Sequence, residues 1–203
     1  DHGVYGKSGR DWYGIMPLTG KILNVRNAPP TSIAANKVVT NLLQALGARH
    51  GVDYTNEVNY KTLNYGKVMV MTDADCDGIH IEGLIINFLH SLFPTLLQRN
   101  ESFVVSMKTP IARVFNGKKT DKLFYDERRF NEWLSQQPGK VNVKYYKGLG
   151  TTKTEDVPDT FGLKMVEYKQ DDSFDLNIHL LLLRSLLKIY LLNFFYSLCV
   201  ELL

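Results

Sequence analysis

The feature that most constrains the fold is an apolar run that ends in a cluster of aspartates. The run is VMVM at residues 68–71, and the segment TDADCDG follows it directly. An uninterrupted apolar run of this length is typical of a strand buried on both faces of a parallel sheet. Open α/β sheets bind their ligands at the carboxyl ends of such strands. We therefore expect the aspartates to lie at a ligand-binding edge of a sheet.

The aspartates are spaced so that they can share one cation. If the chain stays extended beyond the strand, Asp73, Asp75 and Asp77 project to the same side. Carboxylates gathered in this way stay ionised near neutral pH only with a cation or hydrogen-bond donors nearby. Mg²⁺ takes one or two carboxylates and leaves positions for water and phosphate oxygens. We expect a Mg²⁺ site here, in which Mn²⁺ can substitute; a solvated acidic turn is the alternative.

Two other uses of clustered aspartates can be weighed from the sequence. DADCDG matches the start of an EF-hand calcium loop, but the glutamate required at the twelfth position is replaced by Leu84. An EF-hand also needs a helix before the loop, whereas residues 68–71 favour a strand, so this alternative is excluded. A phosphatase-type site with an Asp nucleophile on a strand tip stays open. The lysine and hydroxyl side chains that would identify it are too common to decide.

Strands and helices are expected to alternate along the rest of the chain, after a glycine-rich loop over residues 1–20. Segments that favour a strand are 21–25, 102–115 with a break at Pro110, and 140–152, which ends in a glycine loop. Three segments favour a helix: 32–47, 79–97 and 124–136. The first would be capped by Thr31 or Ser32 and end at Gly47. The third has Asp126 near its start and follows a turn over 117–123. This alternation predicts an α/β sheet.

Composition agrees with an intracellular globular protein. Hydrophobic residues make up 44% of the 203 residues, an ordinary share for a packed core. The formal net charge of +3 does not by itself indicate nucleic acid, because the placement of charge matters more than its sum. The two cysteines, Cys76 and Cys199, form no disulfide framework and fit a reducing compartment. The chain begins without Met or an apolar signal segment, and we expect it to be a piece of a longer protein.

Four motifs in a fixed order give the chain a family resemblance. They are YGIMPLTGKILNVRNA, LNYGKVMVMTDADCDGIHIEGLIINFLH, SMKTPIARV and KYYKGLGTTKTED, within residues 10–172. In this order they closely resemble the type IIA DNA topoisomerases of eukaryotes and large DNA viruses. The resemblance implies that residues 1–172 form a Toprim region: a Rossmann-like, mostly parallel sheet flanked by helices, with a small annex. Members of this family cut both strands of one duplex, pass another through and reseal the break, with gating driven by ATP.

The resemblance also implies roles for individual acidic residues. Asp73, Asp75 and Asp77 match the D-x-D-x-D motif of the family and would hold Mg²⁺ near the scissile phosphate. Asp73 and Asp75 are the stronger candidates. The metal site of the family also uses a glutamate from an EGDSA-like segment, which has no counterpart in this sequence.

The resemblance also implies that two lysines and one histidine lie near DNA. Lys21 in PLTGK and Lys147 in KGLG match family lysines close to the DNA and the cleavage centre. Each would supply a point charge to phosphate, and the neighbouring glycines allow close backbone approach. His80 matches the family's DGxHI position and would contact the DNA backbone.

Other parts of the family's machinery have no match here. The nucleophilic tyrosine and its partner arginine belong to a winged-helix region, and Tyr190 and Tyr196 lie in no matching motif. ATP would be bound only by an ATPase domain that this sequence does not contain. We therefore expect the isolated chain to be inactive. Within the full-length enzyme, this region would act on double-stranded DNA together with the remaining domains and the second subunit of a homodimer.

Location and an alternative function complete these expectations. We expect no small-molecule substrate and no membrane association, and an intracellular location, in the nucleus or at a viral replication site in the host cytoplasm. The alternative is a metal-poor module that binds DNA or a protein partner without a catalytic role. Basic segments such as GKKTDK and ERR can meet DNA phosphates in either case. Metal binding at Asp73 and Asp75 would separate the two functions.

Residues 173–203 depart from the family pattern. They include the apolar run HLLLLRSLLKIYLLNFFYSLCVELL, in which Arg184 and Lys188 interrupt the hydrophobic character. A comfortable membrane crossing needs about 20 apolar residues, and the uninterrupted remainder is too short. The open alternatives are a buried or partner-covered helix and a non-native terminus produced by a misread frame or a truncation. We favour the last.

Overall fold

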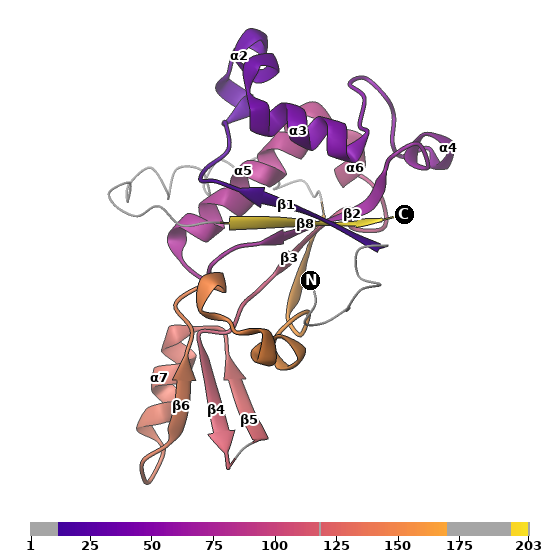
Figure 1. The fold of residues 1–203 in the computed structure, drawn as a ribbon. Helices are drawn as coiled ribbons and strands as arrows, with labels where there is room; N and C mark the ends of the chain where they lie inside the picture. The colour runs from indigo at the N-terminus through magenta and orange to yellow at the C-terminus, as the bar shows by residue number, and fades with distance from the viewer. Residues whose placement is uncertain (1–11, 118, 170–195, 203) are drawn as a thin grey trace.

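In a computed structural model the chain folds around a five-stranded sheet, with a three-stranded annex on one side of it (Figure 1). The structure describes residues 12–117, 119–169 and 196–202. The strands of the larger sheet lie in the order β1, β8, β2, β3, β7. Their bounds are Tyr13–Leu18 for β1, Tyr196–Leu202 for β8, Tyr65–Met71 for β2, Val104–Met107 for β3 and Met165–Tyr168 for β7.

The strand directions confirm an α/β fold but correct one expectation about it. Strand β2 contains the expected apolar run and pairs with β3 in parallel. The pairs β1–β8, β2–β8 and β3–β7 are antiparallel, so the expectation of a mostly parallel sheet is wrong for the described strands. For β7 the reason is the path of the chain. It leaves β3 for the annex and re-enters beside the end of β3, where Met107 pairs with Met165, so β7 must run back.

Helices cover one side of the larger sheet (Figure 1). Their bounds are Pro30–Ala35 for α2, Lys37–Leu46 for α3, Glu57–Tyr60 for α4, Cys76–Leu92 for α5 and Pro94–Leu97 for α6. The main core lies between these helices and the sheet, where Val68 and Val70 of β2 meet Ile81 and Ile85 of α5. The intervening Met69 faces the other way, in a smaller cluster that Phe161 packs against. This alternation is that of a strand covered on both faces.

The expected helix over 32–47 is two helices separated at Asn36. Asn36 is extended, with φ −79° and ψ 113°, and its side chain accepts hydrogen bonds from the amides of Val38 and Val39. It therefore caps α3, a role we had expected of Thr31 or Ser32. A side chain that satisfies two free amides starts a new helix even within an apparently continuous pattern. The expected end at Gly47 is confirmed, because this residue adopts the left-handed conformation with φ 67°.

The first strand lies earlier than expected. Strand β1 falls inside the segment read as a glycine-rich loop, whereas residues 21–24 form no regular element and Val25–Asn27 is a short 3-10 helix, η2. Gly20 turns the chain after β1 with φ 99°. The apolar residues Ile22 and Val25 are only 5% and 4% exposed. Their apolarity reflects burial in the core rather than a strand.

The annex is a three-stranded sheet covered by one helix. Strands β4 (Ala112–Asn116), β5 (Lys119–Phe124) and β6 (Asn142–Tyr145) lie in the order β5, β4, β6, and α7 spans Glu127–Ser135. The turn expected over 117–123 is wrong, because most of it pairs with β4 as β5. Asp126 caps α7 by accepting from the amide of Arg129. Two 3-10 helices, η3 (Leu149–Thr151) and η4 (Thr154–Asp159), lead from β6 to β7.

The apolar tail is described only at its end. Residues 196–202 form β8, a strand rather than a helix, paired with β1 and β2. The expected boundary between 172 and 173 lies outside the described residues, as do Arg184, Lys188 and Tyr190. Among the helices of the described ranges, none is both long and apolar enough to cross a membrane.

Candidate metal centre

Strand β2 delivers two aspartates to the start of a buried helix. The chain remains irregular from Thr72 to Asp75, and α5 begins at Cys76. Asp75 is the N-cap of α5, and its Oδ1 accepts the amide of Gly78 at 2.8 Å. Gly78 has to be glycine for reasons of space, because a Cβ there would lie 2.1 Å from the carbonyl oxygen of Asp73. The helix start therefore packs directly against the end of β2.

Asp73 is the most enclosed of the three aspartates. Its residue exposure is 7%, and its Oδ1 accepts the backbone amide of Leu149 at 2.7 Å. The preceding Gly148 lies against the same carboxylate, where a Cβ would come within 2.5 Å of Oδ2. The glycine loop after β6 and the end of β2, 76 residues apart in sequence, therefore meet at this carboxyl group.

The electrostatics of the aspartate pair suit a hard cation. Burial raises the pKa of Asp73 above its ordinary value, and the charge of Asp75 raises it further against the opposing hydrogen bond from Leu149. A divalent ion between the two carboxylates would relieve both the burial of charge and the mutual repulsion. Each carboxylate uses Oδ1 to accept a backbone amide, which leaves Oδ2 for another partner. Two carboxylates with hard oxygen donors fit Mg²⁺.

Asp77 points to a different partner. Since α5 begins at Cys76, the extended conformation that would align three aspartates does not persist. The Oδ1 of Asp77 forms an ion pair with Lys21 Nζ at 2.8 Å. Within the described part of the chain, no three His, Cys, Asp or Glu side chains gather closely enough to hold a metal ion. The candidate centre is therefore limited here to Asp73 and Asp75, and the ligand roles of all three aspartates stay predictions.

His80 lies near the Lys21–Asp77 pair. It is only 8% exposed, and its Nδ1 has no hydrogen-bond partner among the residues that the structure describes. Burial lowers the pKa of His80, the charge of Lys21 lowers it further, and the charge of Asp77 opposes the change. The lowered pKa favours the neutral ring, and its Nδ1 lies buried below the surface.

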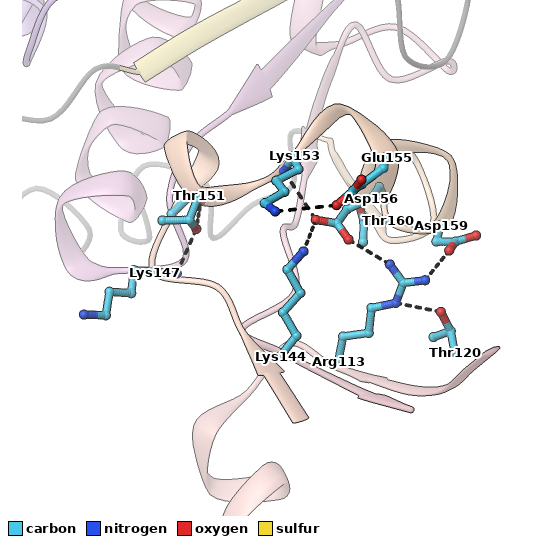
Figure 2. Close-up of polar contacts among 11 residues, drawn as sticks. Arg113, Thr120, Lys144, Lys147, Thr151, Lys153, Glu155, Asp156, Asp159 and Thr160 are labelled. Atoms are coloured by element: carbon cyan, nitrogen blue, oxygen red, sulfur yellow. Dashed lines mark hydrogen bonds and ion pairs between the residues drawn. The ribbon is translucent and has the colours of Figure 1, made fainter. Parts of the chain in front are cut away.

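Lys147 stands at the base of the glycine loop. It is exposed, and its amide donates to Thr151 Oγ1 at 3.1 Å. The Thr151 hydroxyl donates in turn to the carbonyl of Gly148 at 2.7 Å, which closes a tight turn. Figure 2 shows the side chain of Lys147 extending away from the polar cluster of the annex.

A cleft of about 430 Å³ opens beside Asp73. One wall is the end of β2, and the facing residues come from the annex and from β7. Its cationic lining residues are Lys108, Arg128, Arg129 and Lys164. Lys108 is held by Glu82, whose two oxygens accept its Nζ at 2.6 and 2.8 Å. A basic cleft next to a pair of carboxylates can take a phosphate group while the carboxylates hold a cation.

Several residues of this site were not expected from the sequence. The ERR segment was noted as basic, but Lys108 and Lys164 were not, because single lysines carry no pattern. The amide of Leu149 was missed as well, since a backbone group that reaches another segment leaves no mark in the side-chain sequence. The glycine loop around Gly148 was the one available signal.

Comparisons with known proteins find relatives over most of this chain. The family model described as the C-terminal associated domain of TOPRIM matches residues 107–178. DNA topoisomerase 2 of Invertebrate iridescent virus 6 is 43% identical over 182 residues, covering 82% of this chain and 16% of the relative. DNA topoisomerase 2-alpha of Homo sapiens is 44% identical over 158 residues, covering 77% of this chain and 10% of the relative. The chain belongs to the type IIA DNA topoisomerase family.

A solved member of this family has a similar fold. The crystal structure of the Plasmodium falciparum topoisomerase II DNA-binding, cleavage and re-ligation domain matches with a TM-score of 0.67 at 30% identity. The match covers 79% of this chain and 22% of that chain. About four fifths of the chain thus corresponds to part of the type IIA topoisomerases, and the chain spans only a small part of their length. Family membership leaves the phosphatase-type alternative without support.

Proposed function

We propose that this chain is the Mg²⁺-binding Toprim part of a type II DNA topoisomerase that cuts, passes and reseals duplex DNA. The observation that carries the proposal is the carboxylate pair at the end of β2. Asp73 is buried, has a raised pKa and lies beside a second carboxylate, which is an unfavourable arrangement until a cation binds. The aspartates stand at the carboxyl end of a strand, where α/β sheets place their ligands.

The residues of the site would divide the work as follows. Asp73 and Asp75 would hold Mg²⁺, and Asp77 would orient Lys21 through their ion pair. When bound, Mg²⁺ supplies charge stabilisation to the phosphate oxygens and the leaving 3′ oxygen. Lys21 and Lys147 would each attract a DNA phosphate as point charges.

Two further groups would bind the DNA backbone. His80, which lies near the Lys21–Asp77 pair, would contact the DNA backbone. The cationic side chains that line the cleft beside Asp73 would attract the phosphates of the DNA strand where it crosses the annex. These contacts carry no base specificity, so they would position the duplex rather than select its sequence.

Catalysis would need more than these 203 residues. We propose that a polypeptide of this sequence alone neither cleaves nor relaxes DNA, because no segment of it matches the nucleophilic tyrosine motif, the EGDSA-like segment or an ATPase domain. The activity would belong to a homodimer of the full-length enzyme, working in the nucleus or at a viral replication site. Mg²⁺-dependent relaxation of supercoiled plasmid by this polypeptide would contradict this part of the proposal.

The experiment that tests the cation site is calorimetric titration of Mg²⁺ into the 203-residue chain. The comparison is the double variant Asp73→Asn/Asp75→Asn, which removes both charges and keeps a side chain at position 75 that can cap α5. Saturable binding that disappears in this variant supports the proposal. The variant Asp77→Asn decides whether the third aspartate contributes: retained binding leaves the centre to Asp73 and Asp75, as the pairing of Asp77 with Lys21 favours, and lost binding adds Asp77 to it.

The alternative function predicts a different outcome. If wild type and variant both fail to bind Mg²⁺ at millimolar concentration, the chain is a metal-poor module for DNA or a protein partner. Binding that survives in Asp73→Asn/Asp75→Asn would place the cation elsewhere and overturn the assignment of these two ligands.

A further inference from the structure

The annex contains a buried ionic cluster centred on Asp156 (Figure 2). Asp156 lies in η4 and is 4% exposed. Its Oδ1 accepts Arg113 Nη1 from β4 at 3.1 Å, and its Oδ2 accepts Lys144 Nζ from β6 at 2.5 Å. Arg113 is 5% exposed and also donates to Thr120 and Asp159. The cluster therefore joins two strands of the annex sheet to the segment that follows the glycine loop.

Opposite charges stabilise the ionised form of Asp156 in this cluster. Burial alone would raise the pKa of Asp156, but the hydrogen bond and charge of Lys144, the amide of Lys153 and the charge of Arg113 hold it below the ordinary value. Asp156 is therefore ionised at neutral pH, between two cations. Removing one partner from a buried ionic cluster leaves an uncompensated charge, which is strongly unfavourable.

The cluster closes a loop in the chain. Lys144 and Asp156 are 12 residues apart, and their ion pair joins the two ends of the segment between them. The amide of Tyr146 donates to the carbonyl of Ile111 at 2.9 Å, which fastens the first end beside β4. Arg113 fastens the second end to the same strand. Both ends of the loop are thus fixed to β4.

The tip of this loop is the part that meets the candidate metal centre. The amide of Leu149 donates to Asp73 Oδ1 at 2.7 Å, and Gly148 packs against the same carboxylate. Within the loop, the amide of Thr151 donates to the carbonyl of Gly148 at 3.1 Å, so the tip is a single tight turn. The position of a short turn is set by the residues that hold its two ends, and here these residues form the Asp156 cluster.

We propose that Arg113, Lys144 and Asp156 are positioning residues that hold the loop over residues 147–151 against Asp73 and so set the direction of its carboxylate. The inference rests on the proposed function insofar as Asp73 is a Mg²⁺ ligand. The three side chains act on the cation site through the loop, from the annex side of the molecule.

The first measurement is hydrogen exchange at the Leu149 amide in the metal-free 203-residue chain. In Asp156→Asn the volume is kept and the charge is lost, so the Leu149 amide should exchange about ten-fold faster relative to the amides of β2. The matched control is Glu82→Gln, which removes a second carboxylate that is also 4% exposed and bound to a lysine, but lies on α5. This control should leave the relative protection of Leu149 unchanged.

The second measurement is Mg²⁺ affinity by calorimetry. Loss of a group that orients a metal ligand weakens binding about 10- to 100-fold, and this is the result expected for Asp156→Asn. If Asp156→Asn does not fold, Lys144→Met provides the same test, because it opens the loop while Arg113 still pairs with Asp156.

The outcomes separate this inference from the proposed function. Unchanged exchange at Leu149 in a folded Asp156→Asn or Lys144→Met variant overturns the inference. Faster exchange that is matched by Glu82→Gln also overturns it, because the effect would then be general. Absence of Mg²⁺ binding in the wild type contradicts the proposed function, whereas the exchange data still report whether the cluster places the loop.

Discussion

Gly148 illustrates how a single missing side chain can define the site. A Cβ at this position would lie 2.5 Å from Asp73 Oδ2 and 2.7 Å from Cγ, closer than atoms can approach. We expect Gly148→Ala to push the Asp73 carboxylate aside and weaken Mg²⁺ binding about ten-fold or more, measured by calorimetry.

The same loop provides the control for this substitution. Gly150 has no atom within 4 Å of the position that its Cβ would occupy. Gly150→Ala should therefore bind Mg²⁺ as the wild type does, although it makes the same change two residues away. Equal affinities for the two variants would show that contact with Gly148 does not control Asp73.

At the residue scale, the sequence predicted the acidic positions better than their partners. Asp73 and Asp75 were expected from the strand that precedes them, because a buried strand fixes where its following residues emerge. The pairing of Asp77 with Lys21 was not expected, since it requires the helix to begin at Cys76. The Asp156 cluster was missed because Arg113, Lys144 and Asp156 come from three segments with no common spacing.

At the scale of elements, Asn36 decides where α3 begins. Its side chain accepts two backbone amides, from Val38 and Val39, each at 3.1 Å. We expect Asn36→Ala to lower the free energy of unfolding by about 1 kcal/mol, because both amides lose their acceptor. Chemical denaturation monitored by circular dichroism measures the change. Asn36→Asp should remain close to the wild type, since aspartate caps equally well; an equal loss in both variants would contradict the cap.

The most deeply buried elements were predicted best, whereas helix breaks and strands held by pairing were missed. Strand β2 and helix α5 are buried, so their patterns record their surroundings. The segment GKKTDKL was expected to be a turn because it is polar, yet most of it belongs to β5, which pairs with β4 at an edge of the annex sheet. Edge strands can be polar, because one side of the ladder faces solvent. Hydrogen bonding to a neighbour, and not local composition, makes this segment a strand.

At the scale of the whole molecule, the Asp156 cluster should make part of the free energy of unfolding depend on pH in the acid range. The pKa of Asp156 in the fold lies below the ordinary value of 3.8. Its contribution is therefore fully present above pH 3.8 and is lost as the pH falls through the lower folded value. We expect Asp156→Asn to be less stable by up to about 3 kcal/mol at pH 7.

Denaturation measured between pH 7 and pH 3 checks this prediction. The difference in unfolding free energy between wild type and Asp156→Asn should shrink below pH 3.8, since the unfolded wild type binds a proton there and the folded carboxylate, with its lower pKa, resists it. A difference that stays constant over this range would mean that the charge of Asp156 does not stabilise the fold.

The cleft beside Asp73 gives a second prediction at this scale, about DNA. Arg128→Glu/Arg129→Glu reverses two charges of its lining. The slope of log affinity for duplex DNA against log salt should fall by about two, one for each lost phosphate contact. Lys37→Glu/Lys61→Glu makes the same change in net charge at exposed positions in the α2–α4 region, away from the annex (Figure 1). If both double variants weaken DNA binding equally, the cleft has no special role.

Strand direction was the largest error at the whole-molecule scale. The apolar run of β2 correctly indicated a strand covered on both faces, and its pairing with β3 is parallel as expected. The other pairings depend on where the chain travels between strands, which no local pattern records. The annex was expected only as a small addition, and its effect on the direction of β7 could not be foreseen.

The entry and exit of the annex lie side by side. The amide of Lys108 donates to the carbonyl of Lys164 at 2.9 Å, so the chain passes into the annex and out of it through one hydrogen-bonded pair of residues. An inserted unit whose ends are neighbours can be exchanged or lengthened without altering the host sheet. The annex is therefore an inserted unit that can change in evolution independently of the larger sheet. Its surface residues can vary without altering the larger sheet, while the contact of its glycine loop with Asp73 restrains how the annex packs.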